Sequence, residues 1–180
     1  MIETDRLLLR PLTISDLDEV VEMHAAPEVM DTMGPFERPR AAARLEANEH
    51  EWAKRGYGLM AVIDRVTGRF LGRSGLKYWP QLDETEVGWV LRPDAWGHGY
   101  ATEAGAGCLE WGFRTLDFAY LIAMIQPRNA RSIGVAERLG MRRIREDRLG
   151  EIEVVVYAID ASVRADRERG RSPSGLTPPS

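Results

Sequence analysis

The chain has 180 residues, of which 44% are hydrophobic and 29% charged, a composition typical of one soluble globular domain with a full core. Its formal net charge of -4 offers no excess of cations to neutralise the phosphates of a nucleic acid, so no nucleic-acid partner is expected. The apolar runs are too short to cross a bilayer, so no membrane partner is expected. One cysteine excludes an intrachain disulfide, and an N-terminus without a signal pattern predicts a cytoplasmic protein.

The first half of the chain predicts a strand, two helices and a hairpin. The predicted elements are, in chain order, a strand over 6–10, a helix over 17–24, a helix over 38–55, and hairpin strands over 59–64 and 70–77. Pro11 ends the first strand, Pro27 interrupts the first helical pattern, and Gly56 stops the second helix.

The second half predicts alternating strands and helices. The elements are a strand over 84–91, a long helix after the glycine turn at 97–99, a strand over 119–125, a helix over 130–139, and strands over 141–148 and 151–160. This order predicts a mixed α/β domain over 1–162, with at least one parallel crossover around the glycine turn. Residues 163–180 are rich in Arg, Pro and Ser, which predicts a flexible polar tail.

The glycine turn has the features of an anion site. A strand ends, a turn containing Gly97 and Gly99 follows, and a helix begins. Backbone N–H groups converge without partners at such a helix start, where the helix dipole favours negative charge. Phosphate or pyrophosphate is therefore the expected ligand, although glycine at a helix start can also serve turn geometry alone.

Two well-known phosphate loops do not fit the turn. A P-loop needs Gly-Lys-Ser or Gly-Lys-Thr before its helix, and the sequence has no such run. The dinucleotide fingerprint needs a small apolar residue where this chain has Thr102. That fingerprint also belongs to the first strand–helix unit of its fold, whereas this turn lies past the middle of the chain. A nucleotide-binding oxidoreductase is therefore disfavoured.

Four blocks of sequence, in this order and spacing, resemble the GNAT superfamily of N-acetyltransferases. The closest likeness is to the subgroup that includes ribosomal-protein-alanine N-acetyltransferases. The blocks are ETDRLLLRPL (3–12) followed by Asp16, EVGWVL (86–91), WGHGYATEA (96–104) and NARSIGVAERLGM (129–141). The first position of the family's pyrophosphate loop is here Trp96 instead of Gln or Arg, which leaves the backbone donors in place.

The resemblance implies both a fold and a cofactor. The fold is a central mixed, mostly antiparallel twisted sheet of about seven strands flanked by helices, with two parallel strands that splay apart to admit the cofactor. The cofactor is acetyl-CoA, and no metal is implied. The expected cofactor-binding residues are Trp89, Val90, Leu91, Trp96, Gly97, His98, Gly99, Tyr100, Ala101, Thr102, Asn129 and Ser132.

Acetyl transfer to an amine needs a base, because a lysine-like amine with a pKa of about 10 is almost fully protonated at neutral pH. Glu86 matches a carboxylate position of the subgroup and is the candidate base, directly or through water. The alternative is an exposed carboxylate without a role in catalysis. Ser132 matches the position proposed as the acid, or it only satisfies an N–H of the first helical turn. Cys108 falls on the buried face of its helix, which favours packing over an acetyl-enzyme intermediate.

The sequence therefore predicts an N-acetyltransferase that moves acetyl from acetyl-CoA to a primary amine by direct attack in a ternary complex. The acceptor is a small molecule or a protein N-terminus, and the protein is a monomer or a homodimer. The alternative is a non-catalytic CoA-binding sensor that keeps the cofactor loop without turnover.

Overall fold

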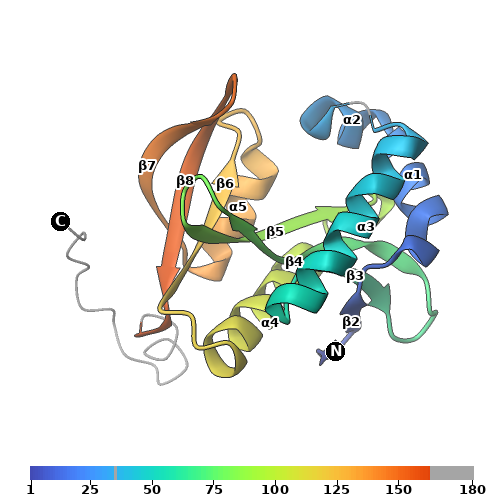
Figure 1. Cartoon of the computed structure of the whole chain (residues 1–180), viewed down its shortest axis with the longest axis horizontal. Coiled ribbons are helices and arrows are strands. Elements are labelled where there is room, and N and C mark those ends of the chain that lie inside the picture. Colours follow the sequence, from blue (N-terminus) through green and yellow to red (C-terminus); the bar gives the residue numbers. More distant parts are fainter. Residues whose placement is uncertain (35, 163–180) are drawn as a thin grey trace.

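The computed structural model describes residues 1–34 and 36–162, and the predicted tail at 163–180 lies outside these described residues. One sheet of eight strands runs through them in the order β1-β2-β3-β4-β5-β6-β8-β7 (Figure 1). The strands are β1 (Ile2–Glu3), β2 (Leu7–Pro11), β3 (Leu59–Asp64), β4 (Phe70–Trp79), β5 (Glu84–Leu91), β6 (Tyr120–Ile125), β7 (Arg142–Leu149) and β8 (Ile152–Asp160). The α-helices are α1 (Leu17–Ala25), α2 (Pro27–Met33), α3 (Arg38–Arg55), α4 (Tyr100–Thr115) and α5 (Ala130–Leu139).

The sheet is antiparallel except between β5 and β6. These two strands are parallel and share a single register pair, Glu86 with Ile122, whereas β4 and β5 share eight pairs. The connection between β5 and β6 passes through α4, as the predicted crossover requires. The two parallel strands therefore splay apart as predicted, and β5 and β6 are not paired beyond Glu86 and Ile122.

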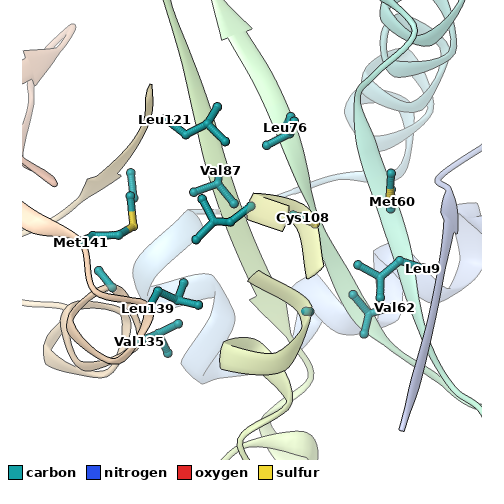
Figure 2. Packing of buried hydrophobic residues seen from close by; sticks show 14 of the residues in the cluster. Leu9, Met60, Val62, Leu76, Val87, Cys108, Leu121, Val135, Leu139 and Met141 are labelled. Carbon is teal, nitrogen blue, oxygen red and sulfur yellow. The ribbon is translucent and has the colours of Figure 1, made fainter. Parts of the chain in front are cut away.

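Two apolar clusters hold helices against the sheet. The larger one contains Cys108 of α4 and Leu139 of α5 together with inward side chains of six strands, some of which Figure 2 shows. The smaller one joins Val20 of α1 and Leu45 of α3 to Ala61 of β3. Because Val87 belongs to the larger cluster and Val90 packs against the smaller one, β5 has helices against both of its faces.

The structure differs from the sequence prediction in two elements. It has eight strands where about seven were expected, because Ile2–Glu3 pairs with Leu8 and Leu9 as a short edge strand. It also has α2, which begins at Pro27, the residue interpreted above as an interruption. Proline fits the first turn of a helix because the N–H it lacks has no intrahelical partner there.

No helix among the described residues is long and apolar enough to cross a membrane.

Candidate active site

A cavity of about 540 Å³ lies beside the end of β5, where that strand has parted from β6. Its walls come from β5, the glycine turn, α4, α5 and α2. Eleven of the twelve residues expected to bind the cofactor line it, namely Trp89, Val90, Leu91, Trp96, Gly97, Gly99, Tyr100, Ala101, Thr102, Asn129 and Ser132. The fold thus brings together two sequence blocks that are about thirty residues apart in the chain.

The start of α4 points unpaired backbone donors at this cavity. Gly99 is the N-cap with φ of +79°, a conformation that favours glycine, and no side chain caps the helix. The first N–H with an intrahelical acceptor is that of Glu103, which donates to the Gly99 carbonyl. The N–H groups of the preceding residues in this first turn are therefore available to an anion.

His98 is the expected cofactor residue that does not line the cavity. Its carbonyl accepts from Arg6 Nη1 at 3.0 Å, and its ring lies 5.9 Å from that of Tyr100. Arg6 also donates to Glu103 of α4 and lies 4.5 Å over the Tyr100 ring. The β1–β2 segment therefore braces the glycine turn from outside the cavity.

Helix α5 forms another wall and contributes cations that the sequence analysis missed. Asn129 Oδ1 accepts from the Ser132 N–H at 3.1 Å, which fixes the first turn of the helix. Arg131 lies 4.5 Å over the Trp96 ring, and Arg138 donates to Thr102 Oγ1 at 3.2 Å. Their seven-residue spacing places both on one helix face, a signal that the sequence contained.

Helix α2 closes the cavity on a further side through Glu28, Val29, Thr32 and Met33. Two side chains from the segment between β6 and α5 hold the helix in place. Gln126 donates to the Thr32 carbonyl at 2.8 Å, and Arg128 donates to the Asp31 carbonyl at 2.7 Å. This wall was absent from the sequence prediction because α2 itself was not predicted.

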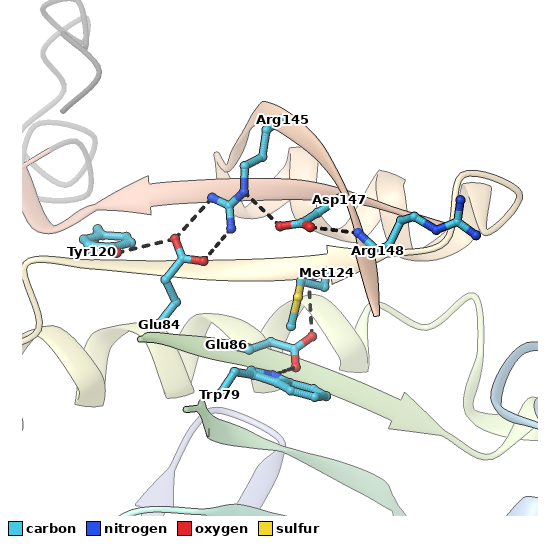
Figure 3. A network of polar contacts seen from close by, with 8 residues as sticks. All are labelled: Trp79, Glu84, Glu86, Tyr120, Met124, Arg145, Asp147 and Arg148. Atoms are coloured by element: carbon cyan, nitrogen blue, oxygen red, sulfur yellow. Dashed lines mark hydrogen bonds and ion pairs between the residues drawn. The ribbon is translucent and has the colours of Figure 1, made fainter. Parts of the chain in front are cut away.

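Glu86 lies at the point where β5 and β6 part, outside the cavity lining. Figure 3 shows its carboxylate between the Trp79 indole N–H at 2.7 Å and the Met124 backbone N–H at 3.3 Å. Burial raises the pKa of Glu86, while these two hydrogen bonds and the cations Lys77 and Arg73 oppose the rise. The side chain is half-buried, so it is not the fully exposed carboxylate considered as an alternative.

Cys108 lies in the core, fully shielded from solvent, with Sγ 3.6 Å from Ser74 Oγ. Burial raises the pKa of this thiol to about 12, so the reactive thiolate is disfavoured at neutral pH. No group of three His, Cys, Asp or Glu residues within 1–34 and 36–162 has an arrangement that could hold a metal ion.

Comparisons with known proteins agree with this architecture. Residues 6–142 match the model of the acetyltransferase (GNAT) domain. YkkB of Bacillus subtilis (strain 168) is 34% identical over 163 residues, which span 86% of this chain and 92% of that protein. YnaD of the same organism, described as an uncharacterized N-acetyltransferase, is 32% identical over 144 residues, 79% of this chain and 82% of YnaD.

Among solved structures, the acetyltransferase from Agrobacterium tumefaciens str. C58 superimposes with a TM-score of 0.79 at 30% identity, covering 88% of this chain and 92% of that one. The family model spans more than half of the chain, and it includes β5, the glycine turn and α5. The chain therefore belongs to the GNAT family of acetyltransferases.

Proposed function

We propose that this protein transfers the acetyl group of acetyl-CoA to a primary amine, by direct attack of the amine in a ternary complex. The cavity beside the parted strands is the observation that carries the proposal. Its walls include the uncapped N-terminus of α4, which is suited to a pyrophosphate, and the end of β5 that no longer pairs with β6. The ribosomal L7/L12 acetyltransferase RimL, which shares the fold at 16% identity and a TM-score of 0.73, is known in complex with coenzyme A.

Charge around the cavity fits the phosphates of this cofactor. Arg131 and Arg138 line it near the start of α4, where the helix dipole already favours anions. Trp89 to Leu91 line the cavity at the end of β5. We assign the phosphates to the helix starts and the extended arm of the cofactor to the strand.

Glu86 is the proposed base. Its pKa is raised by burial, which brings a carboxylate closer to the pH at which it accepts and releases protons efficiently. Ser132 lines the cavity in the first turn of α5 and is the proposed acid for the leaving thiolate. These roles are proposals drawn from position, burial and chemistry.

Direct transfer is favoured because the one cysteine does not suit a covalent intermediate. Cys108 is buried on the α4 face that packs against the sheet, with its thiol kept protonated. Cys108→Ala is expected to retain most of the wild-type kcat in an assay of thiol release from acetyl-CoA. Complete loss of activity in a folded variant would instead require an acetyl-enzyme route.

The experiment that tests the proposed function is calorimetric titration with acetyl-CoA, with NADH as a control that also carries adenine and pyrophosphate. Binding of acetyl-CoA alone, followed by thiol release with an amine panel, is the expected result. Binding without turnover of any amine would favour the CoA-binding sensor. Absence of acetyl-CoA binding by folded protein would overturn both assignments.

A further inference from the structure

The sheet face beneath α1 and α3 has an open site next to Glu86. Strands β4 and β5 pair Arg73 with Val90, Gly75 with Gly88, and Lys77 with Glu86. Paired residues of antiparallel strands share a face, so the glycine pair lies between Arg73 and Glu86. A Cβ added to Gly88 would meet no heavy atom within 4 Å, which leaves free space beside Gly88, whereas Gly75 is packed against the backbone of Gly58 and Leu59.

The groups around this opening carry an excess of positive charge. Three cations interact electrostatically there, namely Arg73, Lys77 and Arg44 of α3. Among the described residues, Glu86 is the one carboxylate whose charge raises the pKa values of Arg73 and Lys77. Arg44 lies 5.4 Å over the Phe36 ring. Neither the Arg44 nor the Arg73 guanidinium forms a hydrogen bond or ion pair with another residue in the described parts of the chain.

Arg73 is half-buried, yet its charge has no direct partner. Burial lowers its pKa to about 10, the Arg44 cation adds to this effect, and Glu86 opposes it. A partly desolvated guanidinium beside a second one is electrostatically unfavourable unless an anion joins them. Arginine is suited to that task because its planar donors match carboxylate and phosphate oxygens.

His24 is a further polar group on this side of the sheet without a hydrogen-bond partner in the described residues. This holds for both ring nitrogens, and the side chain is 3% exposed. The ring lies against Phe36 with 4.3 Å between centroids, in the field of both Arg44 and Arg73. Buried polar atoms are rarely left without partners, so each such group needs an explanation.

We infer that the acceptor amine also carries an anionic group, a carboxylate or a phosphate, which binds Arg44 and Arg73 beside Gly88. This inference rests on the proposed function and names the class of its acceptor. An anion held there completes the charge balance of the cations and leaves the amine on the side of Glu86. Polyamines and amino sugars with several ammonium groups are disfavoured, because they would add charge to a region that already has an excess.

The test measures thiol release at saturating acetyl-CoA for amines in matched pairs that differ in the anionic group. Methionine and methioninamide form the carboxylate pair, O-phosphoethanolamine and ethanolamine form the phosphate pair, and spermidine is the polycation. We expect the anionic member of one pair to exceed its neutral partner by about ten-fold in kcat/KM, through KM. The pair that shows the difference identifies carboxylate or phosphate as the recognised group.

Charge-removing variants locate the effect. In the amine pair that shows the difference, Arg73→Gln and Arg44→Gln are each expected to bring the kcat/KM of the anionic amine close to that of its neutral partner. The Kd for acetyl-CoA is expected to stay unchanged. Lys54→Gln removes an exposed cation from the same helix as Arg44 and serves as the matched control. It is expected to leave the ratio of the two kcat/KM values unchanged.

The two proposals fail in distinguishable ways. Turnover of neutral amines or spermidine as efficiently as of the anionic members would keep the acetyltransferase and overturn the anionic acceptor. If acetyl-CoA binds and no amine reacts, calorimetric titration of the CoA complex with the same pairs still tests the site. Binding of an anionic member that Arg73→Gln abolishes would support the site, and absence of binding by any anionic member would overturn it.

Discussion

At the scale of single residues, Glu86 has a structural role and a proposed catalytic role. Its carboxylate accepts the Met124 N–H at the point where β6 leaves β5, so it stabilises the parting of the strands. It is also a half-buried carboxylate with a raised pKa beside the proposed acceptor site. The pH dependence of catalysis distinguishes the two roles, because a purely structural carboxylate has no proton to exchange with substrate.

Glu86→Gln is expected to lower kcat by about 10²-fold and to remove the acidic limb of the pH–rate profile. In the wild type that limb lies above the ordinary carboxylate pKa, because burial favours the protonated form and activity rises as the group ionises. Glu84→Gln is the matched control, since Glu84 lies on the same strand but pairs with Arg145 (Figure 3). An unchanged limb in Glu86→Gln would exclude Glu86 as the base.

His24 makes stability sensitive to acid. Burial, and then the cations Arg73 and Arg44, lower the pKa of His24 from 6.5 to about 4. Between these two values the unfolded chain takes up a proton that the folded protein does not, so stability falls as pH falls through this window. The full effect is about 3 kcal/mol.

His24→Phe is expected to flatten this dependence without lowering stability at pH 7.5, because it removes a titrating group whose nitrogens have no partner within the described residues. Urea unfolding at pH 7.5 and pH 5 measures the effect in both proteins. Carboxylates such as Asp16, whose lowered pKa also makes acid destabilising, contribute equally to both. Equal slopes in the two proteins would contradict the assignment.

At the scale of elements, the N-terminal hairpin stabilises the glycine turn that precedes α4. Thr4 Oγ1 and Arg6 both donate to Glu103 in the first turn of the helix, and Arg6 also binds the His98 carbonyl. The hydrogen bonds join residues almost a hundred positions apart.

Arg6→Gln is expected to weaken acetyl-CoA binding by about two- to five-fold, with kcat at saturating acetyl-CoA retained. The loss follows from a less ordered turn, since Arg6 does not line the cavity. Arg65→Gln is the control, because Arg65 binds the Thr4 carbonyl in the same hairpin without contacting the turn. Calorimetry on the three proteins measures the difference, and equal Kd values would exclude a positioning role for Arg6.

At the scale of the whole molecule, strands β1 to β5 join β6 to β8 through one register pair and through helix packing. The side chains of Glu84 and Glu86 add hydrogen bonds across the same junction. A ligand in the cavity bridges these halves, because the lining includes β5 from one and α5 from the other. Acetyl-CoA bound there is therefore expected to stabilise the junction of β5 and β6, which has the fewest register pairs in the described parts of the sheet.

Acetyl-CoA at about 100 times its Kd is expected to stabilise the protein by about 2.7 kcal/mol and to raise Tm by about 5–10 °C. Thermal unfolding followed by circular dichroism measures the shift, with NADH at the same concentration as the control. A Tm unaffected by saturating acetyl-CoA would contradict the bridging role of the cavity.

The sequence by itself determined most elements and the family, because local patterns carry that information. The helical spacing of apolar residues predicts helices, the glycine turn marks the start of α4, and Asn129 caps the start of α5. Each of these features acts between residues close together in the chain. The same blocks named eleven of the residues that line the cavity. The prediction failed for α2, where Pro27 can either end a helical pattern or begin a helix, and only packing decides between them.

Only the tertiary structure decided how residues far apart in the chain meet. The partners of Glu86 come from β4 and β6, and packing of α5 beside α4 places Arg131 and Arg138 at the glycine turn. The excess of cations around Gly88 arises when α3 packs over β4 and β5. Burial, which sets the pKa of Glu86 and His24, is a property of this packing and not of local sequence. Chemistry that depends on proximity and desolvation is therefore decided by the fold.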